Sequence, residues 1–138
     1  MRLFDSFAIS GSGLTAERLR LDLIANNIAN VHTTRTAEGG PYRRQVPVFA
    51  QRLEAAATGF KGAGVAVTAI LRDTSPPLLV HDPSHPDADA QGYVHYPNIN
   101  VANEMVDMIG ATRAYEANAT VFEAAKDIAQ RALEIGRG

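Results

Sequence analysis

The sequence predicts a mainly α-helical protein whose long N- and C-terminal helices form an antiparallel coiled coil, with a small irregular β middle region between them. All seven prolines of the 138-residue chain lie between residues 32 and 98. On both sides of this segment, apolar residues recur at helical spacing. We therefore divide the chain into an N-terminal helix (1–31), an extended or β-hairpin middle region (32–98) and a C-terminal helix (99–138) that pairs with the first.

The composition excludes several functions. The net charge is −2 and the sequence has no Lys/Arg cluster, so we expect no basic surface that could bind nucleic acid. No apolar run approaches the roughly 20 residues that span a membrane, so we expect no membrane insertion. The chain has no cysteine, which rules out disulfides and thiol catalysis. Asp5 and Ser6 interrupt the apolar core that a signal peptide would need.

The N-terminal helix has an apolar stripe and an asparagine-rich end. The stripe consists of Leu14, Leu21, Ile24, Ile28 and Val31. Leu19 and Leu23 form a second stripe on another side. Because asparagine competes for backbone hydrogen bonds, Asn26, Asn27 and Asn30 are unusual there. We expect Asn30 to end the helix in the left-handed conformation, and Asn26 and Asn27 to bond the backbone of an incoming segment or a neighbouring subunit.

The middle region reads as short strands and turns. Residues 42–50 and 64–73 are predicted strands, and 77–82 and 92–97 are shorter extended pieces. Residues 38–41 and 59–64 are predicted turns because they are rich in glycine.

The C-terminal helix is predicted to start after Asn100 as N-cap and to stop at Gly136. Some 35 residues at about 1.5 Å each give a rod of roughly 50 Å. One apolar stripe contains Val101, Met105, Met108, Tyr115, Ala119 and Phe122. A second lies nearly opposite and contains Val106, Ala117, Val121, Ala124, Ile128 and Ile135.

Two apolar stripes on one helix indicate two partners, since a helical hairpin covers one stripe of each helix. We expect the first stripes of the two helices to pack together, with Arg113 and Tyr115 in polar contacts there. The second stripes would then meet other subunits. A monomeric helical bundle with the middle region tucked against it stays open as an alternative. The predicted helix–helix and assembly residues are Leu14, Leu21, Ile24, Asn26, Asn27, Ile28, Asn30, Met105, Met108, Arg113, Tyr115, Val121, Phe122 and Ile128.

Candidate catalytic motifs are weak. His81 and His85 have a zinc-like spacing, but Pro83 and Pro86 prevent the helix that would align them. Residues 87–98 begin like a calcium loop but end in Asn98, where the loop needs a glutamate. Residues 11–16, GSGLTA, lack the strand that precedes a dinucleotide-binding turn, so we expect them to allow close helix approach or bending. The prediction is a non-enzyme without metal or cofactor.

Two blocks of sequence resemble a known family. The segment ANNIANVHTT (25–34) and the helical block containing NEMVDMI, RAYEAN and AAKDIAQ (103–130) are similar to the flagellar rod and hook axial proteins. The delayed aromatic Tyr42 and the short middle region resemble the proximal rod member of that family.

The resemblance implies a structural subunit of the bacterial flagellar basal-body rod, which crosses the periplasm as a drive shaft and is exported by the flagellar type III apparatus without a cleaved signal peptide. Its implied partners are further copies in a helical assembly, other rod proteins and ring–rod junction proteins. The alternatives are another axial subunit, a cytoplasmic coiled-coil scaffold, or a metal-dependent enzyme built on the loop of His81 and His85. A scaffold would form a discrete oligomer, whereas an isolated rod subunit would be partly unfolded at both ends.

Overall fold

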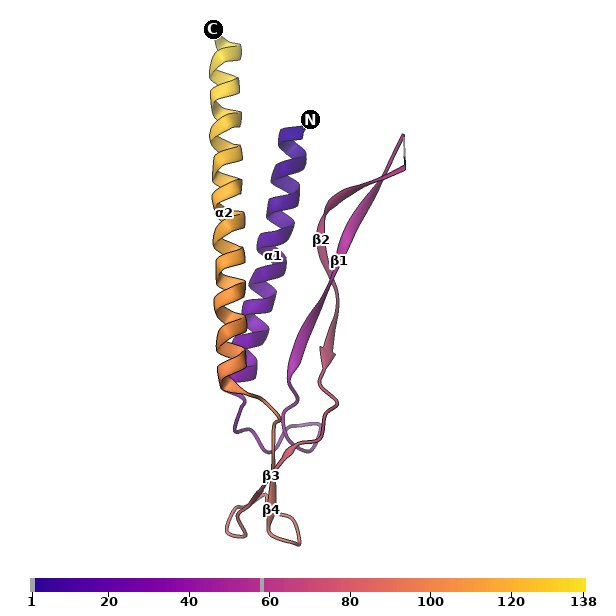
Figure 1. The fold of residues 1–138 in the computed structure, drawn as a ribbon, viewed down its shortest axis with the longest axis vertical. Coiled ribbons are helices and arrows are strands. Elements are labelled where there is room, and N and C mark those ends of the chain that lie inside the picture. The colour runs from indigo at the N-terminus through magenta and orange to yellow at the C-terminus, as the bar shows by residue number, and fades with distance from the viewer. Residues whose placement is uncertain (1, 58) are drawn as a thin grey trace.

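The fold is a pair of long helices flanked by a long β-hairpin. The computed structural model describes residues 2–57 and 59–138. In Figure 1, helices α1 and α2 lie side by side and antiparallel, the β1–β2 hairpin follows α1 on its other side, and the β3–β4 hairpin lies beyond the end of the helix pair. The elements are α1 (Arg2–Ala29), β1 (Gln45–Ala56), β2 (Gly59–Arg72), β3 (Leu78–His81), β4 (Tyr93–Tyr96) and α2 (Val101–Arg137). The prediction of two terminal helices around a small antiparallel β region is confirmed.

Helix α1 is the central element because α2 covers one side of it and the β1–β2 hairpin covers another (Figure 1). Apolar side chains on both sides of α1 are therefore buried, among them Ile24 and Leu23. The prediction that the stripe of Leu19 and Leu23 faces another subunit is wrong for Leu23, because this side chain is buried within the single chain.

Small residues in the GSGLTA segment let three elements approach closely. A Cβ added at Gly13 would lie 2.9 Å from Nδ2 of Asn118 in α2. The hydroxyl of Ser12 accepts a hydrogen bond of 3.0 Å from the backbone N–H of Val65 in β2. Gly64 has a φ of +105°, and a Cβ there would clash with Ser12 Oγ. The prediction of close helix approach is confirmed.

The middle region contains two separate antiparallel pairs. β1 pairs with β2 from Gln45 opposite Arg72 to Ala56 opposite Gly59, with two register shifts along the ladder. β3 pairs with β4 from Leu78 opposite Tyr96 to His81 opposite Tyr93. The prediction of a turn at 59–64 is wrong, because these residues extend β2 and pair with the last part of β1. The predicted turn at 38–41 is confirmed by positive φ angles at Gly39 and Gly40.

Helix α2 begins as predicted and runs further than predicted. The side chain of Asn100 accepts a hydrogen bond from the backbone N–H of Asn103 and caps the helix. The helix continues through Gly136 to Arg137, so the predicted stop at Gly136 is wrong. Glycine lowers helix propensity by about 1 kcal/mol but does not by itself end a helix. Within the described residues, neither helix is long and apolar enough to cross a membrane.

Candidate assembly interface

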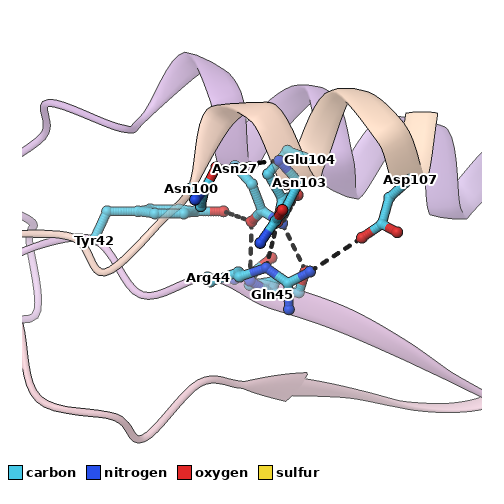
Figure 2. A network of polar contacts seen from close by, with 8 residues as sticks. All are labelled: Asn27, Tyr42, Arg44, Gln45, Asn100, Asn103, Glu104 and Asp107. Carbon is cyan, nitrogen blue, oxygen red and sulfur yellow. Dashed lines mark hydrogen bonds and ion pairs between the residues drawn. The ribbon is translucent and has the colours of Figure 1, made fainter. Parts of the chain in front are cut away.

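A buried polar junction joins the end of α1, the entry to β1 and the start of α2 (Figure 2). At its centre is Asn27, whose side chain is fully buried. The Asn27 amide donates to the carbonyl oxygen of Gln45 at 2.9 Å and to Oε2 of Glu104 at 3.1 Å. Its carbonyl oxygen accepts from the Gln45 N–H at 2.9 Å and from the Tyr42 hydroxyl at 3.1 Å. All four hydrogen-bonding positions of the amide are thus used.

Glu104 is the acidic member of this junction and is 1% exposed. One carboxylate oxygen accepts from Asn27, and the other accepts from Nε of Arg44 in an ion pair. Arg44 also reaches Asp107, one turn further along α2, at 3.4 Å. A buried carboxylate is tolerated when it is paired and hydrogen-bonded, as it is here. The junction therefore connects three elements through one charged group.

Tyr42 is a half-buried member of the junction, and its hydroxyl donates a hydrogen bond to Asn27. Burial raises the pKa of the Tyr42 hydroxyl, and the negative charge of Glu104 raises it further, while the positive charge of Arg72 opposes both. The hydroxyl therefore stays protonated and remains a donor to Asn27 at neutral pH.

The three asparagines have three different roles. Asn27 bonds the backbone of the incoming strand, as predicted. Asn26 is exposed. Asn30 donates from its side chain to the Asn26 carbonyl oxygen at 2.9 Å and accepts from the Thr33 hydroxyl at 3.1 Å. No described residue other than glycine has a positive φ, so the predicted left-handed conformation at Asn30 is wrong. Its side chain, rather than its backbone, shapes the exit from the helix.

The face of α2 that contacts α1 is built from small and half-buried side chains. Ala111 and Ala125 are buried, and Phe122 packs edge-on against Phe7 with ring centroids 5.1 Å apart. Met108 is half-buried. On α1, Ile24 is buried, and Leu14, Leu21 and Ile28 are half-buried. The packing of these four α1 residues against Met108 and Phe122 stays a prediction.

Two residues predicted to pack on α1 are exposed instead. Met105 is 53% exposed and Tyr115 is 36% exposed. Arg113 is exposed as well, and none of the hydrogen bonds or ion pairs found among the described residues joins its side chain to α1. The prediction of polar contacts with α1 at Arg113 and Tyr115 is therefore wrong, while the packing of Met105 and Tyr115 on α1 stays a prediction. The α2 residue that lies against Gly13 is Asn118, and the alanines Ala111 and Ala125, seven residues before and after it, are buried.

The second stripe of α2 is uncovered along its whole length. All of its members are exposed, and the four large ones are Val106, Val121, Ile128 and Ile135. Such a row of exposed large apolar side chains is typical of a surface that another protein covers.

The histidine loop shows no metal-binding arrangement. His81 packs edge-on against Tyr93, and Nδ1 of His85 accepts a hydrogen bond from the backbone N–H of Asp87. Within residues 2–57 and 59–138, no cluster of three or more metal-ligating side chains is found.

Sequence reasoning missed four residues that organise the interface: Phe7, Tyr42, Arg44 and Glu104. Two signals were present in the sequence. An aromatic and two arginines follow the asparagine motif at 42–44, and an acidic residue lies one turn after the N-cap Asn100. Their meeting depends on a tertiary contact that no local pattern reveals.

The paired terminal helices, the hairpin packed against α1 and the exposed apolar side chains of α2 are features of a structural subunit that assembles with other proteins. Two family models match the chain: the flagella basal body rod protein at residues 7–35, and the flagellar basal body rod FlgEFG protein C-terminal at residues 90–135. The chain therefore belongs to the flagellar basal-body rod protein family, as a FlgC-like structural subunit of the rod.

Curated relatives support this assignment over the whole chain. The flagellar basal-body rod protein FlgC of Borreliella burgdorferi is 48% identical over an alignment that covers 100% of both chains. The FlgC proteins of Bacillus subtilis and Aquifex aeolicus are 41% and 40% identical, covering 99% and 97% of this chain and 100% and 97% of their own.

Proposed function

We propose that this rod subunit polymerises through its terminal helices into the shaft that transmits torque across the periplasm. The observation that carries the proposal is the uncovered second stripe of α2, whose members are all exposed in the single chain. A row of apolar side chains on a paired helix requires a further partner. A contact between two different surfaces is heterologous, and it builds an open helical array when the rotation between neighbouring subunits does not close into a ring.

The proposal gives the terminal helices and the middle region different roles. Residues 1–31 and 99–138 form an antiparallel coiled-coil unit that carries the assembly contacts, and residues 32–98 brace the unit from the side. The polar junction at Asn27, Arg44 and Glu104 holds the two parts together. The assembly contacts are made by the exposed members of the predicted interface, with Val121 and Ile128 in the uncovered second stripe.

The partners and location are proposed from the same family membership. Further copies of this chain, other rod proteins and ring–rod junction proteins are the neighbours. The subunit reaches the periplasm through the flagellar export apparatus without a cleaved signal peptide. The N-terminal residues support this route, because Asp5 and Phe7 are structural parts of α1: Asp5 pairs with Lys61 at 2.9 Å, and Phe7 packs on Phe122.

A pair of matched variants tests the assembly surface. Val121 on α2 and Leu71 on β2 are both 53% exposed, so replacing either by glutamate leaves the core of the isolated subunit intact. In cells that lack their own copy of this subunit, we expect Val121→Glu to abolish rod assembly and motility and Leu71→Glu to preserve both. Normal rods with Val121→Glu would contradict the proposal.

A further inference from the structure

The C-terminal end of α2 projects past α1 and has no neighbour along it (Figure 1). Phe7 contacts Phe122, and Gly13 lies against Asn118. By this antiparallel register, the α2 residues beyond about 128 lie past the end of α1. The projecting end carries Leu133, which is 71% exposed. The projecting end belongs to the same helix that α1 covers further back. A second helix packed on this end would therefore extend the existing α1–α2 interface.

A shallow and open apolar surface, which we call the groove, lies along one face of α2 near the other end of the same helix. The groove is lined by Met105, Met108, Ile109, Thr112, Arg113 and Glu116. Arg113 is the sole basic residue between positions 101 and 125 of the sequence.

The charges of the groove and of the projecting end are complementary. The groove presents Arg113 and Glu116, three residues apart, and the projecting end presents Glu134 and Arg137 at the same spacing with the signs reversed. In the described part of the chain, none of these four side chains belongs to an ion pair. All four are exposed and available to a neighbour.

We propose that the projecting end of α2 in one copy lies parallel to the groove of α2 in the next copy, with Arg113 opposite Glu134 and Glu116 opposite Arg137 of the neighbour. A helical array keeps its subunits in one direction, so the two helices run parallel. A shift of about 21 residues, or about 31 Å along the helix, aligns both charge pairs together. The same shift brings Leu133 to Thr112, beside Ile109.

This inference rests on the proposed function and names which two surfaces of the subunit meet. The contact is heterologous, because the groove of one copy receives the projecting end of another and leaves its own projecting end free. Its charge pairs favour this register, and the apolar side chains of the groove are covered by the contact.

Charge reversal tests the pairing. In cells that lack their own copy of this subunit, we expect Arg113→Glu and Glu134→Arg each to reduce the amount of assembled rod about tenfold, and the double variant to restore it. Arg18→Glu, at an exposed position on α1, is the control and should assemble normally. Both sites are on the surface, so circular dichroism of the purified variants should be unchanged. Unaffected single variants, or a double variant that stays defective, would overturn the pairing.

Cysteine cross-linking gives an independent readout, because the chain contains no cysteine. Positions 113 and 134 lie about 31 Å apart on one helix, so a disulfide between Arg113→Cys and Glu134→Cys can form only between chains. We expect a ladder of linked copies in assembled basal bodies. No link, or a link to a different protein, would overturn the inference. Should Val121→Glu still block assembly in that case, the proposed function would stand without it.

Discussion

A single buried amide explains why an asparagine interrupts the end of a good amphipathic helix. Asn27 uses two donors and two acceptors to hold Tyr42, Gln45 and Glu104 (Figure 2). An apolar side chain at this position would leave a buried carboxylate and a strand backbone without these partners. The helix gives up some intrinsic propensity at Asn27, and the fold gains a fixed connection between three elements.

Replacing Asn27 by alanine should destabilise the protein. Asn27→Ala removes four hydrogen bonds in a buried site, and we expect a loss of about 1–3 kcal/mol in the free energy of unfolding, measured by urea titration. Asn26→Ala, at the exposed neighbouring position, should change it by less than about 0.5 kcal/mol. Equal effects of the two variants would contradict the role assigned to Asn27.

Two glycines in α1 offer a second matched comparison. A Cβ at Gly11 meets no atom within 4 Å, whereas one at Gly13 meets the Asn118 amide. Gly11→Ala should therefore stabilise the helix by about 0.5–1 kcal/mol. Gly13→Ala should lose that gain and destabilise the protein, because Asn118 must move. Thermal unfolding measures both, and a stabilised Gly13→Ala would show that the helices are not closely packed there.

At the scale of elements, the terminal helices were predictable and the hairpin only in part. Hydrophobic periodicity, the absence of proline and the cap at Asn100 place both helices to within a few residues. Glycines at 59, 62 and 64 predict a turn, yet they extend β2, because Gly64 lets the strand pass close to Ser12 in α1. Which stripe of α2 meets α1 depends on side-chain size at the contact, and periodicity alone does not decide this.

The connection from α1 to the β3–β4 hairpin should depend on pH. The Thr34 hydroxyl and the Arg35 guanidinium donate hydrogen bonds to Asp87 and hold the pKa of its carboxyl below the usual 3.8. The stabilisation this carboxylate supplies is complete above its unfolded-state pKa and is lost as the pH falls through the lower folded-state value.

We therefore expect faster amide hydrogen exchange at residues 33–36 and 85–88 below about pH 3.8, after correction for the intrinsic pH dependence of exchange. Asp87→Asn should remove this change while leaving the helix pair protected. An unchanged acid response in Asp87→Asn would assign the effect to other groups.

At the scale of the whole molecule, the subunit is a rigid helix pair braced on one side and left open on another. The β1–β2 hairpin covers α1 (Figure 1), while the large apolar side chains of the second stripe of α2 are exposed. The sequence resemblance alone predicted the rod family. The two stripes of α2 predicted an outer contact surface, and the structure leaves that surface exposed in the single chain. The polar junction could not be predicted, because its members are up to 77 residues apart.

The central claim is that the outer face of α2 is buried when the rod is assembled. The most direct measurement is maleimide labelling of Val121→Cys, the sole cysteine of that variant, in the isolated subunit and in purified basal bodies. We expect rapid labelling of the isolated subunit and strong protection in the assembled rod. Equal labelling in both states would contradict the account.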